Sequence, residues 1–397
     1  MKKVLVIAPT FCRSNCATGQ VSRHFFPNFS TDEYKFTIIC NERWGDVGNV
    51  GSCEIVKTPF NPIKDYICRF LFHTPLAHWG NTPDKEWHCW GKEAVKYALQ
   101  LAKKEHFDYI HSICMPASAH VVAYELKKEL GIPWVAQFYD PWRGNPFRVL
   151  RTKAMVKYDK IWEERVAFNA DVVIHPCETM KKYWVEQYGK KVEEKIHILP
   201  FATECPSIAN NQSRKTDKLI ISHIGSFSKN RNSLVFLKAL SILPSEVKDS
   251  VQVNFVGNVT DEEKNAIKDL NLCRVVNLVG IISEQECYGY YEKSDLFLIV
   301  DINCSPNLFY PSKILKYFCY QKPILGITTE QSVIRDELKK TRNFPFSYND
   351  VDGIAKFIVK AVRDYDSLLI NDKKYGDRFS VSNVIDEYQL IIDSILH

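Results

Sequence analysis

The apolar residues of this chain gather in short runs that alternate with longer amphipathic segments. In the first half, runs typical of buried parallel strands cover residues 4–8, 35–40, 109–111, 134–138, 172–175 and 196–199. Segments with helical spacing of their apolar positions lie between these runs, notably at residues 92–104, 117–130 and 151–169. This alternation predicts βα units built around a parallel sheet.

The same pattern starts again in the second half of the chain. It predicts strands at residues 219–224, 251–256, 275–278, 296–300 and 324–327, and helices near residues 233–241, 261–270, 284–293 and 312–320. Residues 205–217 are polar and lack periodicity, so we interpret them as a linker. The sequence therefore predicts an α/β fold with two Rossmann-like domains, residues 1–204 and 218–378, whose parallel sheets face a central cleft. We expect an amphipathic helix at residues 379–397 to pack back on the first domain.

Length and composition support a soluble, two-domain protein. The chain has 397 residues, of which 45% are apolar and 25% charged. No run approaches the ~18 apolar residues that a membrane span needs. The first run, Val4–Ala8, is shorter than the roughly 7–15 apolar residues of a signal peptide, so it indicates a first strand. A net charge of +5 permits attraction to anionic lipid or nucleotide, but it does not indicate nucleic-acid binding.

The thirteen cysteines form no recognisable framework. Their number is odd, no CxxC pair is present, and the nearest pair, Cys12 and Cys16, has no second half-site for zinc. Without a signal sequence, we expect free thiols in a reducing cytoplasm and no bound metal.

One stretch, LFYPSKILKYFCYQKPILGI at residues 308–327, contains candidate chemistry. Pro311 is favoured in the first turn of a helix, and Ser312 can cap free backbone amides. Lys313 then lies beside the positive end of a short helix that leads into a buried strand. The pattern is typical of an anion site, and it is equally compatible with a solvated lysine on a surface helix.

Several segments, taken in order, resemble the retaining glycosyltransferases of family 4, which have the GT-B fold. The resemblance lies in DYIHSICMPASAHVVAYELKKELGIPWVAQFYDPW (108–142), EERVAFNADVVIHPCETMKKYWVEQYG (163–189), HIGSFSKNRNSLVFLKAL (223–240) and YPSKILKYFCYQKPIL (310–325). It runs over nearly the whole chain, although each segment alone is a weak signal. It implies transfer of a sugar from a nucleotide-diphosphate donor to a hydroxyl acceptor, with two domains that close over the donor and without a metal or other cofactor.

The resemblance also implies roles for residues of the second half. The diphosphate is expected to be bound by Lys229, Arg231, Tyr310, Ser312, Lys313 and Lys316, with Lys313 also in a catalytic role. Ile281 and Ile282, in the loop after a strand, are candidates to contact the base. For Lys229 and Arg231, two solvated charges in a turn remain the alternative.

The chain differs from the family at two positions. Members of the family usually carry two glutamates eight positions apart, the second of which binds the ribose, and these positions fall on Leu308 and Lys316. A lysine has only donors and cannot accept from ribose hydroxyls. Either another residue binds the ribose, or Lys316 adds charge against the diphosphate, or donor binding has been lost.

The first half contributes three weaker candidates. Gly19, in the loop after the first strand, can let the backbone approach a sugar phosphate. Asp140, after a buried strand, is a candidate catalytic acid facing the cleft or the start of an Asp-Pro turn. His111, which we place at the end of its strand, is a candidate catalytic base, or else a structural or binding residue.

Residues 65–92 are rich in aromatic side chains and mildly basic. Such a segment suits contact with a membrane interface, because Trp and Tyr prefer one wet and one apolar side. An aromatic patch that covers the core of the first domain is the alternative.

The prediction is a retaining, metal-independent glycosyltransferase of surface polysaccharide or glycolipid assembly, in the cytoplasm or peripheral on the inner leaflet. Its expected partners are a nucleotide-diphosphate sugar and a saccharide or lipid-linked acceptor, without nucleic acid. A sugar-nucleotide epimerase of the same architecture and a degenerate glycosyltransferase that serves as a binding or scaffold subunit are the alternatives.

Overall fold

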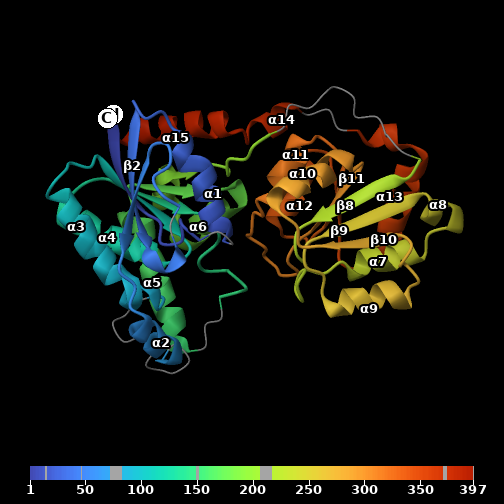
Figure 1. Cartoon of the computed structure of the whole chain (residues 1–397), viewed down its shortest axis with the longest axis horizontal. Coiled ribbons are helices and arrows are strands. Elements are labelled where there is room, and N and C mark those ends of the chain that lie inside the picture. Colours follow the sequence, from blue (N-terminus) through green and yellow to red (C-terminus); the bar gives the residue numbers. More distant parts are fainter. Residues whose placement is uncertain are drawn as a thin grey trace. The chain divides into compact units, whose positions relative to one another are not determined.

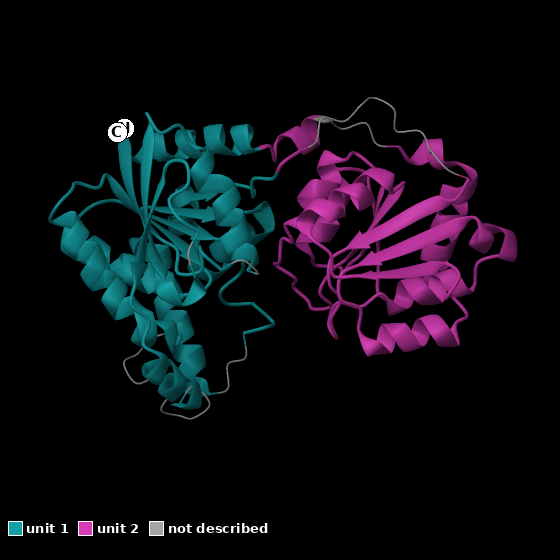
Figure 2. Cartoon of the chain, in the orientation of Figure 1, with its two compact units in different colours: residues 1–203, 381–397 teal, residues 204–380 magenta. Residues whose placement is uncertain are grey.

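The chain folds into two compact units, each with its own parallel sheet. The computed structural model describes residues 1–13, 16–45, 47–71, 83–148, 152–205, 217–369 and 373–396. Unit 1 comprises Met1–Thr203 with Val381–His397, and unit 2 comprises Glu204–Ser380 (Figure 2). Most of the predicted linker, residues 206–216, lies outside the described residues.

Unit 1 is built on a seven-stranded sheet with the order β3-β2-β1-β4-β5-β6-β7, in which every strand pair is parallel. The strands are β1 (Lys2–Ile7), β2 (Tyr34–Asn41), β3 (Cys53–Thr58), β4 (Tyr109–Cys114), β5 (Trp134–Phe138), β6 (Val172–His175) and β7 (Ile196–Ile198). The helices are α1 (Ala17–Phe25), α2 (Pro62–Leu71), α3 (Lys92–Ala102), α4 (Ser118–Leu130), α5 (Lys153–Asn169), α6 (Glu178–Tyr188) and α15 (Val381–Leu396).

Unit 2 repeats the plan with six parallel strands in the order β10-β9-β8-β11-β12-β13. These are β8 (Leu219–Ile224), β9 (Val251–Val256), β10 (Val276–Gly280), β11 (Leu296–Val300), β12 (Ile324–Ile327) and β13 (Phe344–Phe346). The helices are α7 (Leu234–Ser241), α8 (Ser245–Asp249), α9 (Asp261–Asp269), α10 (Glu284–Lys293), α11 (Lys313–Cys319), α12 (Val333–Lys340), α13 (Val351–Arg363) and α14 (Lys373–Asp377). Helices α10, α11 and α12 lie together on one face of the sheet, and α7, α9 and α13 lie on the other (Figure 1).

This architecture confirms the predicted α/β fold of two Rossmann-like domains. Two strands were missed, β3 and β13, and both lie at a sheet edge. Within the described residues, no helix has the length and apolar character that crossing a bilayer requires. The expectation that every cysteine is a free thiol is wrong for one pair, because a disulfide joins Cys205 to Cys319 at the end of α11.

The C-terminal helix α15 is part of the core of unit 1. Its Tyr388 is fully buried, and the hydroxyl lies 2.7 Å from Nδ1 of His111 and 2.9 Å from the hydroxyl of Tyr109, both on β4. Lys2 at the start of β1 forms an ion pair with Asp393, 2.6 Å long. Helix α15 therefore packs against β1 and β4 as part of unit 1.

Replacement of Tyr388 by phenylalanine is expected to destabilise unit 1 by about 1–3 kcal/mol, because buried polar atoms of β4 lose their partner. Tryptophan fluorescence during urea unfolding measures this, since all eight tryptophans lie at or before Trp184. Tyr66→Phe is the matched control, because Tyr66 is 75% exposed and should change stability by no more than about 0.5 kcal/mol. Equal stability of the two variants would contradict this role of Tyr388.

Candidate functional site

Three charged residues of unit 2 follow the carboxyl ends of β8 and β11. These strands are neighbours in the middle of the sheet, at the point where the strand order reverses. In open α/β sheets, ligands bind at this switch point, beyond the carboxyl ends of the strands. Arg231 comes after β8, Asp301 directly follows β11, and Lys313 begins α11.

The side chain of Lys313 lies against the backbone of Gly225, the residue that follows β8. A Cβ atom at Gly225 would be 2.3 Å from Nζ of Lys313, and the φ angle of +144° is one that glycine adopts readily. Within the described ranges, Nζ of Lys313 has no hydrogen-bond or ion-pair partner. The lysine is therefore half-buried, aimed at the switch point and available to an anion.

Arg231 is presented to the same place by a tight turn. Ser228 and Arg231 exchange two backbone hydrogen bonds of 2.9 Å, and the N–H of Asn303 donates to the carbonyl of Asn230 over 2.7 Å. The first contact shapes the loop after β8, and the second ties it to the loop after β11. The Nε atom of Arg231 is buried and has no hydrogen-bond partner in the described part of the chain.

The buried carboxyl of Asp301 partly balances the two cations. It accepts hydrogen bonds from Ser332 and from the N–H of Ile302, the latter over 2.8 Å, and burial raises its pKa to about 6. The pKa of Lys313 is lowered to about 7, first by burial and then by the charge of Arg231, while Asp301 opposes the shift. Lys313 and Arg231 carry two positive charges, whereas Asp301 supplies one carboxyl whose ionisation is disfavoured by burial. A bound anion would therefore relieve the repulsion between the two cations.

The structure places the other predicted diphosphate residues less favourably. Ser312 is exposed, and its side chain does not cap α11, so the expected cap is wrong; Pro311 precedes the helix instead of lying in its first turn. Lys229 is exposed. Tyr310 is buried, and its hydroxyl donates to Glu337 of α12 over 3.2 Å. Since α11 has only seven residues, the side chains of Lys313 and Arg231 contribute more here than the helix end.

Lys316, one turn after Lys313, has a partner within the unit. Its Nζ lies 2.8 Å from Oε1 of Glu284, at the start of α10, and 5.0 Å from the ring centre of Tyr288. Burial acts to lower the pKa of Lys316, but the hydrogen bond and charge of Glu284, together with the smaller effect of Tyr288, outweigh burial and the pKa is raised. This lysine is therefore charged and already neutralised by a carboxylate, so it adds little free positive charge for a diphosphate.

The two isoleucines predicted to contact the base lie in the loop between β10 and α10. Ile281, three residues before Glu284, is 81% exposed, and Ile282, two residues before it, is half-buried. Leu308, at the other position of the missing glutamate pair, is buried. Glu284, at the start of α10, has an accessible carboxylate, because its side chain is 54% exposed.

In unit 1, the prediction that His111 ends its strand is wrong, because β4 continues to Cys114. His111 is fully buried, with Nδ1 2.7 Å from Tyr388 and Nε2 2.9 Å from Oε1 of Gln137. Burial lowers its pKa to about 4. Both ring nitrogens are engaged within the core, so His111 is a structural residue and not a catalytic base.

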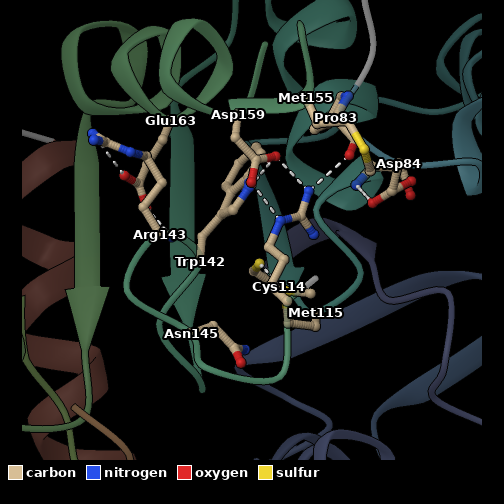
Figure 3. Close-up of polar contacts among 12 residues, drawn as sticks. Pro83, Asp84, Cys114, Met115, Trp142, Arg143, Asn145, Met155, Asp159 and Glu163 are labelled. Carbon is tan, nitrogen blue, oxygen red and sulfur yellow. Dashed lines mark hydrogen bonds and ion pairs between the residues drawn. The ribbon is translucent and has the colours of Figure 1, made fainter. Parts of the chain in front are cut away.

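Asp140 is half-buried, two residues after β5, in a loop that buried charges hold in place. Arg148 donates to Asp159 of α5, and it also donates to the carbonyl of Pro83 over 2.7 Å. The indole N–H of Trp142 donates to Asp159 over 3.1 Å (Figure 3). These contacts fix the backbone on the carboxyl side of Asp140.

A second buried carboxyl supports the same loop. Glu163 of α5 accepts from the backbone N–H of Arg143 over 2.9 Å (Figure 3), and burial raises its pKa to about 7. The prediction that Gly19 lies in the loop after β1 is wrong, because Gly19 belongs to the first turn of α1, where a Cβ atom would lie 2.5 Å from the carbonyl oxygen of Thr10. Any side chain at Gly19 would therefore displace α1 from the loop after β1.

Among the residues that the structure describes, no group of three or more His, Cys, Asp or Glu side chains is arranged to hold a metal ion.

The chain is similar to known proteins in part of its sequence and in its fold. The model of Glycosyltransferase Family 4 matches residues 34–203, which lie in unit 1. No curated protein sequence matches the chain. Among solved structures, HepE of Anabaena in complex with UDP is similar with a TM-score of 0.68 and 13% identity, covering 99% of this chain and 100% of HepE.

Two further solved structures are similar over nearly their full length. Sucrose-phosphate synthase from Thermosynechococcus elongatus has a TM-score of 0.74 and 12% identity, covering 100% of this chain and 99% of the synthase. WaaG, a glycosyltransferase involved in lipopolysaccharide biosynthesis, has a TM-score of 0.65 and 12% identity, covering 98% of this chain and 99% of WaaG. At these identities the likeness establishes the fold, which is GT-B.

The chain thus has the GT-B fold, and the model of Glycosyltransferase Family 4 matches residues 34–203 of it. This confirms the resemblance that the order of its motifs indicated.

Three residues of the site were not predicted from the sequence. Gly225 gives room to Lys313, and its position directly after a predicted strand, at the end of HIG, could have indicated this role. Asp301 had a signal as the acid that directly follows the apolar run LFLIV. Glu284 had none, because its pairing with Lys316 joins two elements far apart in the sequence.

The pKa of about 7 at Lys313 predicts a pH-dependent affinity for inorganic pyrophosphate. Lys313 is charged below this pKa and loses its charge above it, so the affinity contributed by the lysine falls as the pH rises. Lys313→Arg is the matched control, because arginine stays charged and ionisation of the ligand affects both proteins equally. Between about pH 6.5 and about pH 8.5, the affinity of the wild type should fall on the order of tenfold relative to this variant. Parallel pH profiles in calorimetric titrations would contradict the assignment.

Proposed function

We propose that this protein transfers a sugar, with retention and without a metal, from a nucleoside-diphosphate sugar to a hydroxyl acceptor. The observation that carries the proposal is the convergence of Lys313 and the unpartnered Nε of Arg231 at the switch point of unit 2. A diphosphate is a ligand with the charge to neutralise both. The UDP in the HepE structure supports a uridine donor.

The charges of the site suit the chemistry of the leaving group. When the sugar–phosphate bond breaks, negative charge develops on the departing diphosphate. Cations that are already in position stabilise this charge without reorganisation. Lys313 and Arg231 supply them, Gly225 lets Lys313 approach, and Lys229 adds an exposed charge on the loop that carries Arg231.

The nucleoside end of the donor has a candidate site of its own. Lys313 and Lys316 are one helical turn apart on α11, and Lys316 anchors the carboxylate of Glu284. We assign Glu284 to the ribose hydroxyls, because a carboxylate can accept from them whereas Lys316 cannot. Ile281 and Ile282, on the loop just before Glu284, would contact the base.

In unit 1, the start of α1 with Gly19 and the loop after β5 with Asp140 are assigned to the acceptor and the transferred sugar. In a retaining reaction the departing phosphate can accept the proton of the acceptor hydroxyl, so the core position of His111 is consistent with the proposal. Surface polysaccharide or glycolipid assembly is the proposed setting. The lipopolysaccharide role of WaaG supports it.

The test is turnover of a panel of UDP-sugars, measured as release of free UDP without acceptor. One donor should be hydrolysed slowly, and Lys313→Ala should lower kcat/KM at least about tenfold, equivalent to ~1.4 kcal/mol. Lys238→Ala, at an exposed lysine of α7 on the opposite face of the sheet, is the control and should leave kcat/KM unchanged. Binding of a donor without any turnover would instead support the degenerate, scaffold alternative.

A further inference from the structure

Helix α2 of unit 1, residues Pro62–Leu71, buries an acidic side chain and not an apolar one. Its N-terminus is fixed by Asn61, whose side chain accepts from the N–H of Lys64 over 2.9 Å. Its buried side chain is Asp65, which is 6% exposed. Asp65 pairs with Arg43 over 3.2 Å, with Arg69 over 2.7 Å, and with Lys85. The pairs with Arg43 and Lys85 hold the helix on the unit, and the pair with Arg69 lies within the helix.

The apolar side of α2 faces outward. Ile63, Tyr66, Ile67 and Phe70 are 72%, 75%, 48% and 70% exposed. Their spacing of three, four and seven residues places all four on one face of the helix, opposite Asp65. Helices of globular proteins usually direct such a stripe toward the core, so this orientation needs a partner outside the unit.

The charges beside the stripe have one sign. Asp65 is the only acidic residue of α2, and its carboxylate is buried and neutralised. Lys64 and Arg69 flank the stripe and are exposed, and Nζ of Lys64 has no partner among the described residues. The accessible face of α2 therefore offers apolar and aromatic side chains together with cations, and no anion.

We propose that α2 is a membrane-docking helix, which lies in the headgroup region of an anionic bilayer with its stripe turned toward the acyl chains. A short amphipathic helix with aromatic and aliphatic residues on one face and basic residues beside them has the chemistry for this surface. A second protein copy fits less well, because a stable dimer uses roughly 20–30 residues a side and the stripe has four side chains. The proposal does not use the donor site of unit 2.

The test is co-sedimentation of the full chain with vesicles of phosphatidylcholine alone or of phosphatidylcholine mixed with phosphatidylglycerol. The wild type should sediment with the anionic vesicles, and high salt should weaken its binding because surface charges are screened. The double substitution Ile67→Glu with Phe70→Glu should reduce binding at least about tenfold. Lys64→Glu should reduce binding to anionic vesicles and leave the weaker binding to neutral vesicles unchanged.

Leu390→Glu is the matched control, because Leu390 on α15 of the same unit is 73% exposed but is not part of such a stripe. It should bind as the wild type does, and circular dichroism should show every variant folded. No sedimentation of the wild type with anionic vesicles would overturn the proposal, as would equal binding by the double variant. A dimer in solution that the double variant dissociates would overturn it too, in favour of a second copy.

Discussion

The repulsion between Lys313 and Arg231 is the constraint on which the account of this protein depends. The fold brings two cations to one point of unit 2, where they are opposed by Asp301, a carboxyl whose own pKa is raised by burial. Burial and repulsion together lower the pKa of Lys313 to about 7, so protonation of this lysine costs free energy unless an anion is bound beside it. An incoming diphosphate removes that cost, and the gain is largest when the charge of the diphosphate is highest. The same charges can therefore favour binding of the donor and departure of its leaving group.

The parallel sheet makes this convergence possible. Arg231, Asp301 and Lys313 are far apart in sequence, but each follows a strand that ends at the same edge, and β8 and β11 are neighbours there. Backbone bonds between the two loops hold the arrangement, and Gly225 provides the space for the lysine. Unit 1 has the same strand order around β1 and β4, with a different set of buried polar residues. In that unit the polar groups serve packing: Trp134 donates to Ser112, and His111 is enclosed by Tyr388 and Gln137.

Sequence reasoning succeeded where local pattern decides structure. Apolar runs identified the central strands of both sheets because central parallel strands are buried on both faces. It missed β3, which is half-exposed, and β13, which contains Pro345; both are edge strands, where burial is lower and proline is tolerated. At the site, Lys313 and Arg231 were predicted through the family resemblance. The Glu284 pairing, the core position of His111 and the Cys205–Cys319 bond could not be predicted, because each depends on a contact between distant segments.

Calorimetric titration with UDP tests the central claim most directly, because it measures the diphosphate site without requiring the correct sugar or acceptor. The account predicts micromolar affinity for the wild type. It also predicts a loss of at least about tenfold, or ~1.4 kcal/mol, for Lys313→Ala and for Arg231→Ala, with no change for Lys238→Ala. No detectable binding of UDP or of any other nucleoside diphosphate, or equal affinity of all four proteins, would contradict it.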